Sequence, residues 1–141
     1  MKEFFSHSPL DTESFAEALA KSLSGGEVIA FSGNLGMGKT CFVRGLARGL
    51  GFEGEVTSPT FAIINEYIGG RLPLYHFDMY RVTGWDDLYS TGYFEYSESG
   101  GVLAVEWSEN IEAALPDDAI RVEICAISEN DRKITVTGGA F

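Results

Sequence analysis

Cations are scarce in this chain of 141 residues. Ten lysines and arginines stand against 21 aspartates and glutamates, which gives a formal net charge of −11. A surface of that sign repels the phosphate backbones of nucleic acids. We therefore expect the chain not to bind tRNA or DNA without the help of a partner.

Cysteines and long apolar runs are scarce as well. The two cysteines, Cys41 and Cys125, show neither CxxC nor Cys/His spacing, which argues against a zinc site and against a disulfide framework. Near the start only Phe4 and Phe5 form an apolar pair, which is too short for a signal peptide or a membrane span. We expect a cytoplasmic protein with no membrane contact.

Length and apolar periodicity predict a single α/β domain over residues 1–141, with helices flanking a sheet. Apolar residues at helical spacing predict a first helix, capped by Asp11, Thr12 or Ser14 and ended by the glycines at 25–26. Its expected apolar positions are Phe15, Ala18, Leu19 and Leu23. Two further helices are expected over residues 39–50 and 111–115.

Apolar runs and alternation predict the strands of the sheet. Four strands are expected, over residues 28–31, 61–67, 74–77 and 102–105. Residues 120–124 and 134–136 alternate in polarity around a turn at 128–131, which predicts a C-terminal antiparallel β-hairpin. Residues 85–96 show no clear period, and we expect a loop there with at most a short helix.

A glycine-rich segment joins the expected strand at residues 28–31 to the helix at 39–50. Residues 33–40 match the pattern G-x-x-x-x-G-K-[ST], in the strand-to-helix context that such a match requires. We therefore expect the sheet to be that of a P-loop NTPase-like fold. The candidate nucleotide-binding residues here are Gly33, Asn34, Leu35, Gly36, Met37, Gly38, Lys39, Thr40 and Cys41.

The residue types of this loop suit a nucleotide phosphate. Glycines let consecutive backbone N–H groups surround a phosphate, and a helix N-terminus adds a favourable dipole. We expect Lys39 to supply charge to the β- and γ-phosphates and the Thr40 hydroxyl to ligate Mg²⁺. At Cys41 we expect only the backbone N–H to contribute.

Two apolar runs end in an acid, Asp78 after residues 74–77 and Glu106 after residues 102–105. Ligands of open α/β sheets bind at the carboxyl ends of strands, where both acids are expected. One acid is expected to hold Mg²⁺ and the other to orient water. His76 is expected to be a hydrogen-bonded structural residue rather than a base. The hydroxyl cluster at residues 57–60 lies where a loop sensing the γ-phosphate is expected.

At these residues the sequence resembles the TsaE (YjeE) family, small bacterial ATPases of the tRNA threonylcarbamoyladenosine (t6A) pathway. The resemblance spans nearly the whole chain. It rests on residues 33–40, Ser-Pro-Thr-Phe at 58–61, His-Phe-Asp-Met-Tyr-Arg at 76–81 and Val-Glu-Trp at 105–107. The loop departs from the usual family pattern at Asn34, Met37 and Cys41, where aspartate, alanine and threonine are frequent.

The resemblance implies ATP and Mg²⁺ as cofactors. It implies Lys39 and Thr40 in the phosphate loop, Glu106 on the metal beside Thr40, and Asp78 near the γ-phosphate. Lys39, Asp78 and Glu106 are thus the candidate catalytic residues. It also implies a switch-like loop containing Ser58 and a nucleotide-binding arginine at the last hairpin turn, which would be Arg132.

The resemblance further implies a TsaB–TsaD-like heterodimer as the partner. In that family TsaD transfers the threonylcarbamoyl group, and TsaE uses ATP to support repeated turnover. Catalysis on tRNA is then not the chain's own. The aromatic and acidic segment at residues 85–96, together with Trp107, is our candidate docking surface.

Three functions stay open on the residues alone: a slow partner-dependent ATPase, a small-molecule or nucleotide kinase, and a noncatalytic nucleotide-gated binding module. A kinase calls for a lid and several cationic clamps, and the arginines of this chain form no arginine-rich segment. No Asn-Lys-x-Asp stretch for reading guanine occurs, which argues against a GTPase.

Overall fold

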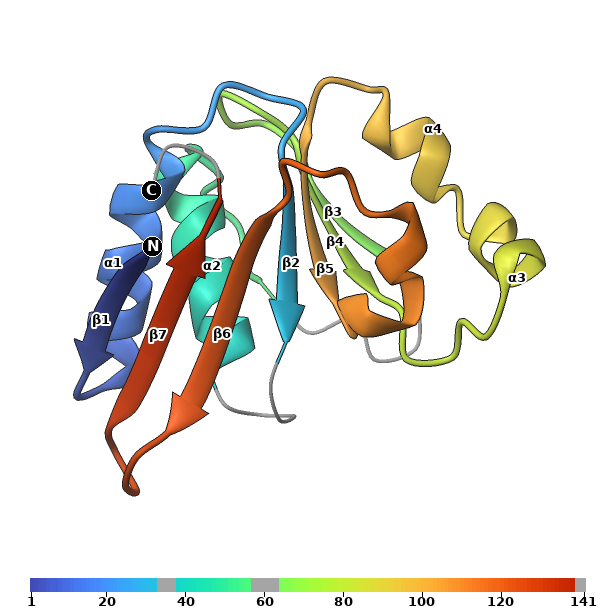
Figure 1. Ribbon diagram of the computed structural model, residues 1–141. Helices are drawn as coiled ribbons and strands as arrows, with labels where there is room; N and C mark the ends of the chain where they lie inside the picture. Colours follow the sequence, from blue (N-terminus) through green and yellow to red (C-terminus); the bar gives the residue numbers. More distant parts are fainter. Residues whose placement is uncertain (33–37, 57–63, 139–141) are drawn as a thin grey trace.

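The computed structural model describes residues 1–32, 38–56 and 64–138. A seven-stranded mixed sheet in the order β1-β7-β6-β2-β5-β4-β3 forms its centre (Figure 1). The strands are β1 (Lys2–Ser6), β2 (Val28–Ser32), β3 (Ile64–Tyr67), β4 (Leu74–Asp78), β5 (Val102–Glu106), β6 (Ile120–Ala126) and β7 (Arg132–Thr137). Neighbours among β4, β5, β2 and β6 are parallel, whereas β1 with β7, β7 with β6 and β3 with β4 are antiparallel.

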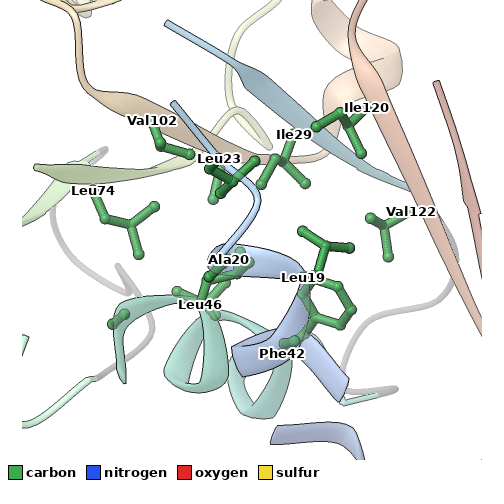
Figure 2. Close-up of a cluster of buried hydrophobic side chains, with 14 of the residues drawn as sticks. Leu19, Ala20, Leu23, Ile29, Phe42, Leu46, Leu74, Val102, Ile120 and Val122 are labelled. Atoms are coloured by element: carbon green, nitrogen blue, oxygen red, sulfur yellow. The ribbon is translucent and has the colours of Figure 1, made fainter. Parts of the chain in front are cut away.

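Helices cover both faces of the sheet, which explains the continuous apolar runs of the central strands β2 and β5. One face carries α1 (Pro9–Ala20) and α2 (Lys39–Gly49), and the other carries α3 (Trp85–Ser90), α4 (Tyr93–Ser97) and the 3₁₀ helix η1 (Ser108–Ala114). Figure 2 shows the core beneath α1 and α2, where Leu19 and Phe42 gather with Ile29, Ile120 and Val122 of the sheet.

The contact between α1 and α2 is made by small residues. A Cβ atom built on Gly45 of α2 would lie 2.8 Å from the Cβ atom of Ala16, and one built on Gly49 would lie 2.6 Å from that of Ala20. Beside this contact, Arg48 Nη2 donates to Glu13 Oε1 over 2.9 Å. The close approach fixes the position of α2, and therefore of the residues at its N-terminus.

The expected fold class is confirmed: one α/β sheet is flanked by helices and ends in an antiparallel hairpin, β6 with β7. Strands β2, β4 and β5 and helix α2 lie where the sequence predicted them. The strand expected at residues 61–67 is present as β3, and residues 61–63 lie outside the described part of the chain. Within the described ranges no helix is both long and apolar enough to cross a membrane.

The expected start of α1 was wrong. The N-cap is Ser8, whose hydroxyl accepts the backbone N–H of Asp11 over 3.1 Å, and Pro9 follows at the first helical position. The expected apolar residue Ala18 is exposed, while Glu13 and Ala16 are buried. Glu13, Ala16 and Ala20 are buried because they face the glycines of α2, and Leu19 is buried in the core as expected.

Three other expectations needed correction. Strand β1 was not expected, and it exists because it pairs with β7 from the far end of the sequence. The loop expected at residues 85–96 is instead two helices, α3 and α4, held on the sheet by buried Leu88 and Tyr93. The helix expected at 111–115 begins three residues earlier, as η1, and is a 3₁₀ helix.

Candidate functional site

The two candidate acids lie at the carboxyl ends of their strands, where the sequence placed them, and the fold brings them side by side. β4 and β5 are parallel and adjacent, and their register pairs Asp78 directly with Glu106. β5 also pairs with β2, the strand that leads into the glycine-rich loop. Because neighbouring strands lie about 4.8 Å apart, the carboxyl ends of β4, β5 and β2 form one continuous edge at which this loop begins.

Strand alternation decides which way these side chains face. Leu74 of β4 and Val102 and Ala104 of β5 belong to the core beneath α1 and α2, whereas Tyr75 and Leu103 belong to the core on the opposite face. Every second residue of a strand shares a face. Asp78 and Glu106 therefore lie on the α2 side of the sheet, the side on which this helix begins with Lys39.

Glu106 has a buried partner. His76 is 0% exposed and Glu106 is 7% exposed, and His76 Nε2 lies 2.6 Å from Glu106 Oε2. The other ring nitrogen of His76, Nδ1, is buried and has no hydrogen-bond partner among the described residues. The sequence predicted a hydrogen-bonded histidine here but not its partner, because the pairing depends on the register of β4 on β5.

Helix α2 begins beside this edge. Its N-cap is Gly38 with φ of 100°, a left-handed conformation that a residue without Cβ adopts at no steric cost. Lys39 follows and is 3% exposed. Its Nζ lies 5.9 Å from the centre of the Trp107 ring, within the range of a cation–π interaction. Thr40 is half-buried in the first turn of the helix.

Trp107 directly follows Glu106 and connects several parts of the site. With φ of 57° it has the only positive φ among the non-glycine residues that the structure describes. Its ring packs against Tyr80, with ring centres 4.9 Å apart, as well as lying under the Lys39 ammonium. The Val-Glu-Trp motif at 105–107 was recognised in the sequence. The stacking of its tryptophan could not be predicted, because Trp107, Tyr80 and Lys39 come from three segments that meet only in the folded chain.

Side chains from η1 tie the three strand ends together. Ser108 Oγ donates to the carbonyl of Phe31 in β2 over 2.9 Å. Asn110 Nδ2 donates to the carbonyl of Met79, just after β4, also over 2.9 Å. The backbone N–H of Met79 in turn donates to the Glu106 carbonyl over 3.1 Å. These bonds hold the two acids at a fixed separation from the end of β2.

A hollow of about 190 Å³ lies on the other side of α2, between the start of this helix and the C-terminal hairpin. Gly38, Cys41 and Arg132 are among the residues that line it. Arg132 Nη1 donates to the carbonyls of Ser128, Glu129 and Asp131, over 2.9 Å, 3.2 Å and 3.0 Å, which braces the hairpin turn. The fold thus brings Cys41 and Arg132 to one hollow, although the sequence separates them widely.

The same turn is also tied to the start of α1. His7 Nδ1 lies 2.8 Å from Asp131 Oδ1. This hydrogen bond raises the pKa of His7 above its ordinary value, and it lowers the pKa of Asp131. The ion pair is exposed at the surface, beside the hollow rather than inside it.

The structure therefore brings together part of the expected site: Gly38, Lys39 and Thr40 at the start of α2, Asp78 and Glu106 at the strand ends, and Cys41 and Arg132 at the hollow. The remaining candidates lie outside the described residues, namely Gly33, Asn34, Leu35, Gly36, Met37 and Ser58. Among the described residues no group of three His, Cys, Asp or Glu side chains is placed to hold a metal.

Comparison with known proteins gives consistent matches. A family model described as "Threonylcarbamoyl adenosine biosynthesis protein TsaE" matches residues 6–134. The chain is 42% identical over 129 residues to the tRNA threonylcarbamoyladenosine biosynthesis protein TsaE of Bacillus subtilis, which covers 92% of this chain and 80% of that one. It is 39% identical over 131 residues to the protein of that name from Treponema pallidum, covering 93% and 96% of the two chains.

A solved structure shows the same fold. The crystal structure of YdiB from Bacillus subtilis superposes with a TM-score of 0.81 at 37% sequence identity. The match covers 97% of this chain and 84% of that one.

Proposed function

Because the chain belongs to the TsaE family, we propose that it binds ATP with Mg²⁺ and hydrolyses the nucleotide slowly in support of tRNA t6A biosynthesis. The relatives it matches carry t6A biosynthesis in their names. The proposal makes the chain an ATP hydrolase of this pathway and not the transferase that modifies tRNA. It includes a cytoplasmic location, because tRNA is the substrate of the pathway.

The observation that carries the proposal is the edge formed by the ends of β2, β5 and β4. The proposed phosphate loop, residues 33–40, follows β2 in the sequence, and a carboxylate stands at the end of each of the next two strands of the sheet, Glu106 on β5 and Asp78 on β4. Nucleotide hydrolysis at such a loop calls for these parts, because it relies on positioning and on charge stabilisation rather than on covalent chemistry.

Each residue has a proposed role. Lys39 contacts the β- and γ-phosphates, the Thr40 hydroxyl and the Glu106 carboxylate hold the metal, and Asp78 orients the attacking water near the γ-phosphate. Thr40, Asp78 and Glu106 offer oxygen donors, which fits Mg²⁺. When bound, Mg²⁺ neutralises charge that develops on the phosphate oxygens.

The remaining candidates complete the nucleotide site. Gly33, Asn34, Leu35, Gly36, Met37 and Gly38 are proposed to surround the phosphates with backbone N–H groups, and Ser58 to face the γ-phosphate. Cys41 is proposed to contribute its backbone N–H to the α-phosphate, and Arg132, which lines the hollow beside α2, to contact the nucleotide from the hairpin turn.

We expect hydrolysis by the isolated chain to be slow. Four arginines are engaged in other contacts: Arg44 and Arg48 with Glu13, Arg71 with the carbonyls of Ala20 and Leu23, and Arg121 with Glu112. Arg132 braces the hairpin turn through Nη1 and lines the hollow beside α2. Arg81 is exposed. An arginine supplied to the γ-phosphate is worth ~10³-fold or more in such enzymes, so a partner that supplies or orders one would accelerate the reaction.

Phosphate release from ATP tests the proposal. Purified chain should release phosphate slowly, only with Mg²⁺, and faster with a TsaB–TsaD heterodimer. Lys39→Ala should abolish release, whereas Lys21→Ala, an exposed lysine at the end of α1, should not. Binding of ATP without phosphate release under any of these conditions would favour a nucleotide-gated module. Unchanged binding and hydrolysis in Lys39→Ala would refute the phosphate-loop assignment.

The proposed partner is a TsaB–TsaD heterodimer, and the proposed docking surface lies on α3 and η1. Trp85 and Tyr89 are 52% and 62% exposed. Trp85 also borders an apolar hollow of about 100 Å³ whose walls include Leu88 and Ile111. Tyr93, expected in the same surface from the sequence, is only 2% exposed and belongs to the core.

Charge supports a protein partner with a basic rim. Residues 82–120 contain nine aspartates and glutamates and no lysine or arginine. The same charges repel RNA, and they would repel a second copy of this face. A cationic protein surface that inserts an apolar side chain into the hollow would complement it.

Affinity for the purified heterodimer, measured with ATP and Mg²⁺, tests this surface. Trp85→Ala with Tyr89→Ala should weaken binding about tenfold or more, because exposed aromatic anchors dominate such interfaces. Ile68→Ala is the matched control, since Ile68 is 57% exposed but lies beyond β3. Equal affinities for the double variant and the control would place the docking surface elsewhere.

A further inference from the structure

We propose that His76 is a positioning residue, whose ring holds the Glu106 carboxylate in the orientation that the metal site needs. The inference rests on the proposed function, because it gives Glu106 its role at the metal. His76 itself contacts neither nucleotide nor metal in this account. It acts through Glu106, to which it is joined by the 2.6 Å contact between Nε2 and Oε2.

The sheet builds this pair from two strands. The register places His76 opposite Ala104, and Glu106 is the next residue of β5 on the same face. Diagonal neighbours on a sheet are within reach of long side chains. Because Ala104 has only a methyl group, the imidazole can lie across it and reach the carboxylate. A larger side chain at position 104 would occupy that space.

The direction of the hydrogen bond follows from the chemistry of the two groups. An ionised carboxylate only accepts hydrogen bonds, so Nε2 carries the hydrogen and donates it to Oε2. No second partner of the Glu106 carboxylate lies among the described residues. One carboxylate oxygen is thus fixed by His76, and Oε1 stays available for a cation or for its water.

A purely structural role does not account for a histidine here. His76 is flanked in β4 by the buried apolar residues Tyr75 and Phe77, in a strand where an aliphatic side chain would pack without polar atoms. Its Nδ1 is buried without a partner among the described residues, which is unfavourable for folding. Among the described residues, the Nε2 bond to Glu106 is the one polar interaction that the ring makes. Carboxylates that bind metals are commonly held by such outer hydrogen bonds.

Two substitutions distinguish a positioning role of His76 from a purely structural one. His76→Gln keeps an N–H donor near the position of Nε2, and His76→Leu removes it. For His76→Leu we expect the Mg²⁺ concentration for half-maximal phosphate release to rise about tenfold or more, as for other outer-shell losses, with a smaller change in the KM for ATP. His76→Gln should restore most of the Mg²⁺ response. Without nucleotide, the thermal midpoint of His76→Leu should fall, because the buried Glu106 carboxylate loses its hydrogen-bond donor, and His76→Gln should recover most of it.

A double variant tests whether the effect of His76 on the Mg²⁺ response passes through Glu106. If His76 acts through Glu106, His76→Leu should add little to the loss already caused by Glu106→Gln. Multiplied losses in the double variant would overturn the inference, as would an unchanged Mg²⁺ response in His76→Leu or a fall in its thermal midpoint that His76→Gln shares. A wild-type chain that neither binds nor hydrolyses ATP with Mg²⁺ would instead overturn the proposed function, and this inference with it.

Discussion

Replacing Gly45 by alanine should destabilise this protein, although the same change stabilises most helices. Gly45 lies inside α2, where it faces α1. Alanine is favoured over glycine in a helix interior by about 1 kcal/mol. Propensity alone therefore predicts a more stable variant, and the packing of the two helices predicts the opposite.

The structure gives the size of the opposing effect. The added Cβ would lie 2.8 Å from the Cβ of Ala16, whereas carbon atoms pack at about 3.5–4.0 Å. It would also overlap the backbone carbonyl of Glu13, which cannot rotate away. Overpacking of this kind costs about 1–3 kcal/mol, and contact with rigid backbone favours the upper end. After the gain in propensity, we expect a net loss of about 2 kcal/mol in the free energy of unfolding.

Urea denaturation followed by circular dichroism measures this difference. Gly84→Ala is the matched control, because a Cβ at Gly84 meets no atom within 4 Å and its backbone is extended. The control should lower the unfolding free energy by no more than about 1 kcal/mol, since Gly84 is the N-cap of α3 and alanine caps a helix less well than glycine does. A Gly45→Ala variant as stable as the wild type, or more stable, would show that the contact of α1 with α2 is not as close as described.

Two further predictions concern the metal and the hairpin turn. Glu106→Gln should weaken the Mg²⁺ dependence of ATP hydrolysis more than Asp78→Asn does, and the reverse order in Mg²⁺ titrations would exchange the proposed roles of the two acids. The hydrogen bond to Asp131 raises the pKa of His7 above 6.5, so its contribution to stability is complete at lower pH and is lost as the pH rises through the raised pKa. Asp131→Asn should return the pKa of His7 towards its ordinary value in an NMR titration, and an unchanged pKa would refute this account.

Much of the sheet could be predicted because its central strands are buried on both faces. β2 and β5 carry uninterrupted apolar runs, and the alternation of β6 and β7 marks a hairpin with one apolar face. Strands with such patterns can be recognised from the local sequence alone. Strand β1 has no comparable pattern, since only its pairing with β7 makes it a strand. Helices α3 and α4 are six and five residues long, too short to show a helical period.

The candidate site was predictable to the extent that it follows strand ends. Asp78 and Glu106 could each be placed at the ligand-binding edge in advance because ligands of open α/β sheets bind at the carboxyl ends of strands. The bond between His76 and Glu106 could not be predicted, since it depends on a register that no local pattern encodes. The same holds for the ring of Trp107 under Lys39, which needs β5 and α2 to be placed first.

The most direct test of the central claim, that this chain uses ATP to sustain t6A formation by its partner, is product yield in a reconstituted reaction. A limiting TsaB–TsaD heterodimer would be supplied with tRNA, the threonylcarbamoyl donor, ATP and Mg²⁺, and t6A would be counted per heterodimer. With the wild-type chain we expect many products per heterodimer, and with Lys39→Ala about as few as with no chain added. Equal yields in all three reactions would contradict the account.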